Sequence, residues 1–180
     1  MARGISNTQE FFVSLDATTS ELLELVSSVG VTTINIVPFE DSWTAAQLAV
    51  HVTKSNKAIA QALNMEGKNA ERSPGERVAE LKGMFLDFTV KFNSPEFIRP
   101  KPGEYEKGGL IAELKRSIEQ LKELRSKINL SEIINLPAFG EITKLELLHF
   151  VLYHTNRHVH QLKNIIKALE SNKIYQYGKS

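Results

Sequence analysis

The stretch FVLYHTNRHVHQLKNII, residues 150–166, places three of the chain's five histidines within seven positions of an apolar segment. At about 100° per residue, an α-helix puts His154 and His158 about 40° apart on one face. That face also carries Leu147, Val151, Leu162, Ile165 and Leu169. A buried imidazole needs a hydrogen-bond partner or a metal ion, because burial of an unpaired polar group is costly. The stretch therefore predicts a long helix with two histidines on its core-facing side.

The composition indicates an ordinary globular protein with one domain over residues 1–180. Of the 180 residues, 42% are apolar and 24% are charged. The net charge of +1 gives no electrostatic reason to expect nucleic acid or an anionic membrane as a partner. Neither a signal peptide nor an apolar run of membrane-spanning length is visible, so we expect a cytoplasmic protein. Without cysteine, a metal site must use imidazole and carboxylate ligands.

Hydrophobic periodicity predicts five helical segments and no strand pair. Their approximate ranges are 7–29, 41–65, 78–92, 110–128 and 144–169. Long amphipathic helices with mostly short connections predict an all-α fold, an up-and-down four-helix bundle with one extra or divided helix. We expect a long loop over residues 93–109, between the middle helices, and no sheet of three or more strands.

Local signals place several of the helix ends. Gly30 ends the first helix, and residues 31–40 form a linker, because a lone strand gains little stability. Asp41 or Ser42 is the expected cap of the second helix. Thr143 and Glu146 have the spacing of a capping box at the start of the last helix.

The pair His154 and His158 requires a third ligand from another helix if it binds a metal ion. His51 lies on or beside the apolar side of the second helix, and three such histidines would leave open positions on a divalent ion. Hydrogen-bonded core histidines are the competing interpretation of all three. His149 and His160 point about 140–160° away from the pair, so we expect both at the surface or facing a partner, not among the ligands.

The segments WTAAQLAVH and FGEITKLELLHFVLYHTNRHVHQL, residues 43–51 and 139–162, resemble the DinB-like superfamily. This damage-inducible group has relatives among thiol-dependent S-transferases and hydrolases. The family pattern is a Trp before a helix, a His eight residues later, and a late His-x-x-x-His leading into Gln. Here the corresponding residues are Trp43, His51, His154, His158 and Gln161. Where many members have a sequence such as His-Arg-Gly-Gln, this chain has His-Val-His-Gln.

This resemblance implies a four-helix bundle, often dimeric, that holds a divalent metal ion on His51, His154 and His158. The ion would be zinc, nickel or iron, and zinc or nickel is favoured, although imidazole ligands suit all three. The expected activity is thiol-dependent S-transfer or hydrolysis of a small molecule, with a low-molecular-weight thiol as a candidate co-substrate.

The alternative function is a metal- or ligand-binding module without turnover. No general base stands out beside the ligands, and whether the chain is an enzyme stays open on the sequence alone. Glu40 and Asp41 are candidates only, because charged residues at a helix start are more often caps. Trp43, Asn156 and Gln161 are candidates for positioning the ligands or the substrate.

Overall fold

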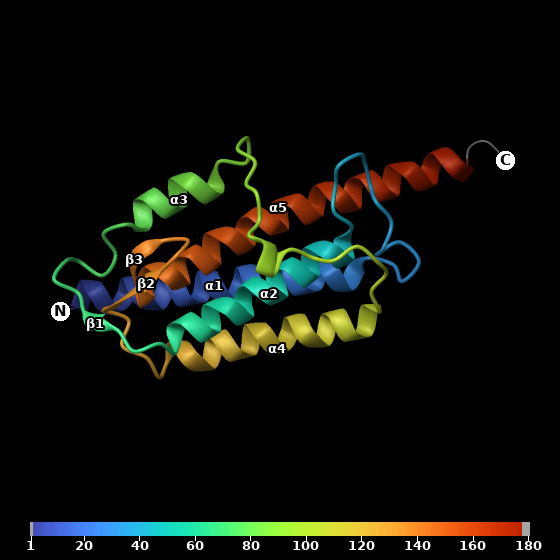
Figure 1. The fold of residues 1–180 in the computed structure, drawn as a ribbon. Coiled ribbons are helices and arrows are strands. Elements are labelled where there is room, and N and C mark those ends of the chain that lie inside the picture. The colour runs from blue at the N-terminus through green and yellow to red at the C-terminus, as the bar shows by residue number, and fades with distance from the viewer. Residues whose placement is uncertain (1, 178–180) are drawn as a thin grey trace.

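Four long helices and one short helix make up most of the computed structural model, which describes residues 2–177 (Figure 1). The helices are α1 (Ala2–Ser28), α2 (Ala45–Leu63), α3 (Val78–Leu86), α4 (Lys107–Arg125) and α5 (Lys144–Tyr177), with a 3-10 turn η1 (Glu96–Ile98). The strands are β1 (Lys68–Asn69), β2 (Glu132–Leu136) and β3 (Gly140–Thr143). The predicted all-α bundle is confirmed, and residues 31–40 form turns between α1 and α2.

The four-helix bundle is as expected, but the order of helix directions corrects the expected up-and-down connectivity. Helices α1 and α5 run in one direction, while α2 and α4 both run in the other (Figure 1). The chain reverses between α1 and α2 and again between α4 and α5. Between α2 and α4 it returns over residues 64–106 to the end where α2 began. This returning segment, which includes the long loop expected from the sequence, crosses the side of the bundle formed by α2 and α5.

The apolar core consists of two clusters, one toward each end of the bundle. One cluster joins the start of α5 to the C-terminal half of α2, with Leu147 and Leu63 among its fully buried members. The other joins the N-terminal half of α2 to the later part of α5, with Leu48 and Leu162. His51, His154 and His158 lie on the same two helices between these clusters, so the polar triad interrupts the apolar core near its middle.

A small antiparallel sheet corrects the expectation that no sheet of three or more strands would form. Its order is β1-β2-β3, and Ile134 of β2 pairs with Ile142 of β3. A three-residue connection joins these two strands, and Gly140 follows it with a φ of +63°. The sequence pattern missed the sheet because its strands are only two to five residues long. Buried Ile134 and Ile142 pack the sheet on the first cluster.

Helix α3 ends at Leu86, six residues before the predicted end at Phe92. Arg157 of α5 donates hydrogen bonds to the carbonyl oxygens of Phe85, Asp87 and Val90. These carbonyls bind a guanidinium and do not continue the helical ladder, and the Asp87 carboxylate accepts from the backbone N–H of Thr89 at 3.0 Å. The helix therefore stops where side chains satisfy its backbone groups.

Capping residues set the starts of α2 and α5. Thr44, and not the expected Asp41 or Ser42, caps α2 through a capping box with Gln47. The predicted box at α5 is confirmed: the backbone N–H of Thr143 donates to the Glu146 carboxylate, and the Thr143 hydroxyl accepts from the N–H of Glu146.

The Glu146 carboxylate also holds distant segments together, although its side chain is fully buried. Arg72 donates two hydrogen bonds to it at 2.6 and 2.7 Å, and the backbone N–H of Arg77 donates a third at 2.8 Å. Burial alone would raise the pKa of Glu146, but the bonds from Arg72 and from the N–H groups of Thr143 and Arg77 outweigh it and lower the pKa. The ionised carboxylate thus ties the segment before α3 to the start of α5.

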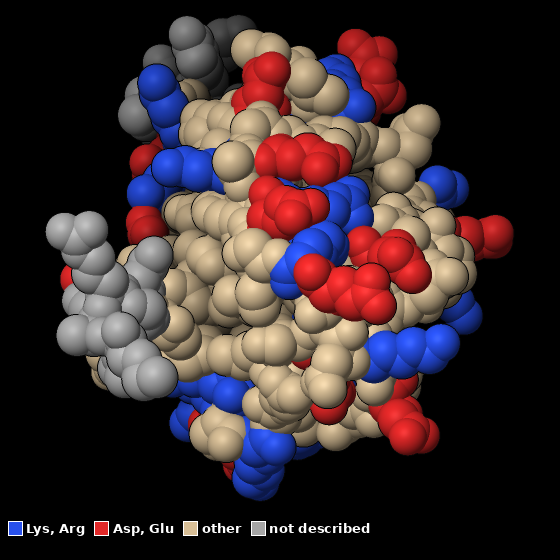
Figure 2. All heavy atoms as spheres, turned by 90° about the vertical axis from the view of Figure 1, so that its left-hand side faces the viewer, with Lys and Arg blue, Asp and Glu red and all other residues tan. Residues whose placement is uncertain are grey.

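On the face that Figure 2 shows, acidic and basic side chains are interspersed, and no large patch of one sign forms there. Within the part of the chain that the structure describes, no helix combines the length and the apolar composition needed to cross a membrane.

We predict that Glu146→Gln lowers the free energy of unfolding by about 3 kcal/mol at pH 7, because it leaves Arg72 without its carboxylate partner. The stability from ionised Glu146 is present above the unfolded pKa and is lost as the pH falls through the lower folded pKa. The variant should therefore lose less stability than the parent between pH 5 and the acid unfolding transition. Urea unfolding at several pH values measures both effects.

Glu119→Gln is the matched control, because Glu119 is exposed and lies 3.9 Å from Lys115 in a surface ion pair. Such pairs contribute little, so this variant should unfold within about 0.5 kcal/mol of the parent. Equal stability of both variants would contradict the role assigned to Glu146.

Candidate metal centre

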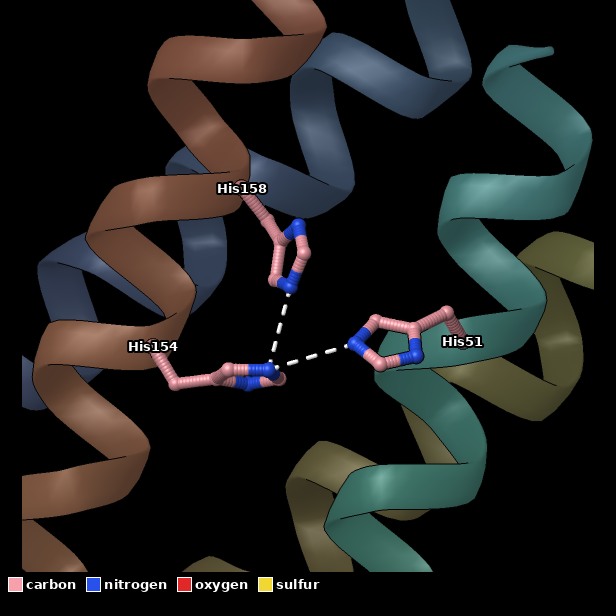
Figure 3. Close-up of side chains that lie close together, drawn as sticks. All are labelled: His51, His154 and His158. Atoms are coloured by element: carbon pink, nitrogen blue, oxygen red, sulfur yellow. Dashed lines mark hydrogen bonds between the residues drawn. The ribbon is translucent and has the colours of Figure 1, made fainter. Parts of the chain in front are cut away.

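Three imidazole rings meet between α2 and α5 (Figure 3). His51 comes from α2, and His154 and His158 come from successive turns of α5. The Nε2 atom of His154 lies 3.2 Å from Nε2 of His51 and 3.0 Å from Nε2 of His158. One nitrogen from each ring falls within 4.8 Å of the other two, and all three residues are buried. The structure thus brings together the three histidines that the sequence singled out.

Carbonyl oxygens fix the outer nitrogen of two rings. Nδ1 of His51 lies 3.2 Å from the backbone oxygen of Ile98, and Nδ1 of His158 lies 3.0 Å from Oε1 of Gln161. Because a carbonyl oxygen only accepts, each Nδ1 carries the proton and donates it. Both Nε2 atoms are then unprotonated, and their lone pairs point toward His154.

The donor set fits a divalent metal ion. Two nitrogens about 2.1 Å from one ion lie about 3.0–3.4 Å apart at the usual bond angles, and the observed separations of 3.0 and 3.2 Å agree with this. A single Nε2–H on His154 cannot donate well to both neighbouring nitrogens at once. A cation between the three nitrogens satisfies all of them.

The surroundings keep the rings neutral. Burial lowers the pKa of His158 to about 3 and lowers the pKa of His154 well below its usual value, and the neighbouring histidines add to the effect at His154. Burial also lowers the pKa of His51, although its hydrogen bond to Ile98 opposes this. Neutral imidazole is the form that binds metal ions, so the rings are ready as ligands near pH 7.

Aromatic side chains hold two of the rings in place. Phe150 stacks on His154 with ring centroids 5.0 Å apart, and Phe85 meets the same ring edge-on at 6.3 Å. Trp43 packs against His51 at 5.0 Å. These contacts restrict ring rotation, which preorganises the nitrogens for binding.

The triad lies in the wall of an open pocket of about 1000 Å³. Its walls come from α2, α3, α5, the segment before α2 and the segment after α3. Trp43 and Gln161 also line it, as expected, and Glu40 and Asp41 lie at its exposed edge. The pocket gives a small molecule direct access to the three nitrogens.

The remaining residues weighed in the sequence lie outside the triad. Asn156 does not line the pocket, and its amide donates to the Leu152 carbonyl at 3.1 Å. His160 is exposed and stacks on Phe88 at 4.2 Å, as expected of a residue outside the triad. His149 also lies outside the triad, but it is half-buried, because Phe11 stacks on it at 3.8 Å. This contact corrects the expectation of an exposed His149.

Three features of the site had no clear signal in the sequence. The Ile98 carbonyl reaches His51 from a loop 47 residues away. Ser55 lies one turn from His51, lines the pocket, and makes no side-chain hydrogen bond within the described residues. Arg157 was visible beside His158, but its partners on the segment after α3 are tertiary contacts that periodicity does not reveal.

Comparisons with known proteins agree with the fold. TT2238, a four-helix bundle protein of known crystal structure, aligns with a TM-score of 0.57 at 20% identity, over 87% of this chain and 98% of its own. YfiT from Bacillus subtilis, described as a probable metal-dependent hydrolase with an unusual four-helix bundle topology, aligns with a TM-score of 0.55 at 13% identity. That alignment covers 88% of this chain and 85% of YfiT. No curated protein matches the sequence.

At these identities the two structures establish similarity of fold alone. The sequence itself provides the evidence for family membership, because the model of the DinB superfamily matches residues 14–162. This range contains all three buried histidines and the whole pocket wall contributed by α2 and α3. The chain belongs to the DinB superfamily.

Proposed function

We propose that His51, His154 and His158 bind a divalent metal ion and that the chain is a metal-dependent enzyme acting on a small molecule. The supporting observation is the convergence of three buried Nε2 atoms at the wall of an open pocket. YfiT, a protein of the same fold, is described as a probable metal-dependent hydrolase, which favours hydrolysis as the reaction. Zinc or nickel is the favoured ion, and iron also suits imidazole ligands.

A divalent ion held by three neutral ligands lowers the pKa of a bound water or thiol and polarises a substrate oxygen. The protein contributes position and protonation state. The Ile98 carbonyl and Gln161 hold His51 and His158 with Nε2 directed inward. The Ser55 hydroxyl has no hydrogen-bond partner among the described residues, and one turn from His51 it is placed to hydrogen-bond a molecule in the pocket.

Thiol-dependent transfer is the second candidate reaction, and one feature of the site favours it. The cluster of potential ligands among the described residues consists of histidines alone, with no carboxylate beside them. Hydrolysis usually needs a base to handle the protons of water, whereas a thiol ionises more readily and needs less assistance. A low-molecular-weight thiol would supply the thiol group that this cysteine-free chain lacks.

We predict that alanine in place of His51, His154 or His158 cuts metal occupancy to below about a tenth of the parent value, because two imidazoles hold a divalent ion far less well than three. The measurement is elemental analysis of protein purified without a metal-affinity column. Chelator should lower the melting temperature of the parent and barely change that of His154→Ala, because the ion stabilises only the folded state that binds it.

His160→Ala is the matched control, since His160 lies on the same helix but is exposed and stacks on Phe88. It should keep the metal content of the parent. A metal-free, stable parent that does not respond to zinc, nickel or iron would contradict the proposal and favour hydrogen-bonded core histidines.

Gln161→Leu should weaken metal affinity by about tenfold with little effect on stability, because the His158 ring loses the acceptor that fixes its orientation. Asn164→Leu is its control: Asn164 lies on the same helix at the edge of the pocket, and its amide contacts exposed His160, not the triad. Competition with a chromophoric chelator measures both affinities. Equal affinities in the two variants would exclude the role given to Gln161.

Turnover separates the two reactions from a binding module. Metal-loaded protein should hydrolyse activated esters or amides, or accelerate reaction of a small thiol with an electrophile, and His158→Ala should lose the activity with its metal. Tight metal binding without turnover in either screen would identify a non-catalytic binding module.

A further inference from the structure

Aromatic residues are concentrated around the pocket to an unusual degree. Seven of the chain's nine phenylalanines and its only tryptophan line it. They are Phe39, Trp43, Phe85, Phe88, Phe92, Phe97, Phe139 and Phe150. The other two phenylalanines, Phe11 and Phe12, pack on the core at α1. Packing of the bundle thus uses few phenylalanines away from the pocket.

Several of these rings are exposed. Phe39, Phe88, Phe92 and Phe97 expose 44–69% of their surface, and Met84 in the same wall exposes 44%. Every exposed phenylalanine in the described part of the chain lies at this pocket. Single exposed apolar side chains are common, but a group of them around one cavity marks a binding site.

Three of the exposed rings, Phe88, Phe92 and Phe97, belong to the segment after α3, which also orients His51. Phe97 precedes Ile98, whose carbonyl accepts the hydrogen bond from His51. Phe92 stacks on Phe85 at 5.3 Å, and the Arg157 guanidinium lies 4.8 Å from the Phe92 ring centroid. These contacts anchor the segment and therefore hold its rings at the pocket.

The charge of the site indicates what kind of group a ligand would place at the triad. Three neutral imidazoles leave the full charge of a divalent ion uncompensated, and no carboxylate accompanies them in the described cluster. An anionic oxygen or sulfur from the bound molecule would offset this charge in an apolar setting.

We propose that the pocket binds a small amphipathic molecule, with an anionic metal-binding head at the triad and an aromatic or alkyl body against Phe88, Phe92 and Phe97. This inference rests on the proposed metal site. The volume of about 1000 Å³ and the opening onto the triad suit a small molecule better than a flat protein interface. The side-chain hydroxyl of Ser55 supplies a hydrogen-bonding group in the pocket wall, one turn from His51.

Straight-chain hydroxamic acids test this proposal, because the head binds zinc or nickel and the tail lengthens by one methylene at a time. With zinc-loaded protein, calorimetry from acetohydroxamic to octanohydroxamic acid should show the dissociation constant falling by about twofold to fourfold per methylene. In Phe92→Ala and Phe97→Ala the dependence on chain length should flatten, while acetohydroxamic acid should bind within about twofold of the parent.

Val13→Ala is the matched control, because Val13 is an exposed apolar residue on α1 away from the pocket. It should keep the full dependence on chain length. An affinity independent of chain length in zinc-loaded parent would overturn the inference and leave the metal site intact. The metal-depleted variant His158→Ala distinguishes failure of this inference from failure of the metal site. In this variant the longer acids should still bind more tightly than the shorter ones, and each acid should bind more weakly than it binds the parent.

The exposed rings could instead contact a second copy of the chain, and sedimentation of the same variants tests this by measuring their oligomeric state. The Phe92→Ala and Phe97→Ala variants should have the same oligomeric state as the parent. If they dissociate a parent dimer and the affinity of the parent does not change with chain length, the exposed rings form a subunit interface, and the proposal is wrong.

Discussion

Burial of three imidazole rings between α2 and α5 is the constraint on which the rest of the structure depends. A neutral imidazole in an apolar core has two nitrogens to satisfy, and failure to satisfy them costs free energy. Ile98 and Gln161 each accept from one outer nitrogen, and the inner nitrogens face one another at 3.0 and 3.2 Å. Without a cation between them, the three inner nitrogens are incompletely satisfied, so this arrangement favours binding of a cation. The apolar clusters on both sides supply the stability that this polar centre does not.

The chain connectivity supplies the hydrogen-bond acceptor that His51 requires. A simple hairpin between α2 and α4 would leave the outer side of His51 without an acceptor. The long return over residues 64–106 instead brings η1 to α2, where Lys54 binds the Arg99 carbonyl at 2.8 Å and the neighbouring Ile98 carbonyl reaches His51. The same return carries four of the phenylalanines that line the pocket: Phe85, Phe88, Phe92 and Phe97. One irregular segment therefore completes both the site and its access.

Sequence patterns predicted the parts of the fold that follow from helical periodicity. The four long helices, the capping box at Thr143 and the shared face of His154 and His158 all depend on residues close in the chain. The missed features depend on contacts between distant residues. The sheet consists of strands too short to show alternation, and Arg72 reaches Glu146 across 74 positions. Hydrogen bonds at the triad fall into the same two groups, since Gln161 is three residues from His158 and Ile98 is 47 from His51.

Arg157 explains why the helix predicted from the apolar spacing is longer than α3. The residues after Leu86 keep a helical spacing of apolar side chains, Phe88 and Phe92 among them, so periodicity extends the helix. The guanidinium competes for the carbonyls of Phe85, Asp87 and Val90, and its partial burial lowers its pKa without removing its charge. A continued helix would present those rings in one direction, along α5. Ending the helix instead lets Phe88 stack on His160 and Phe92 on Phe85, on different parts of the pocket wall. The residue beside a candidate metal ligand thus shapes the cavity through which that ligand is reached.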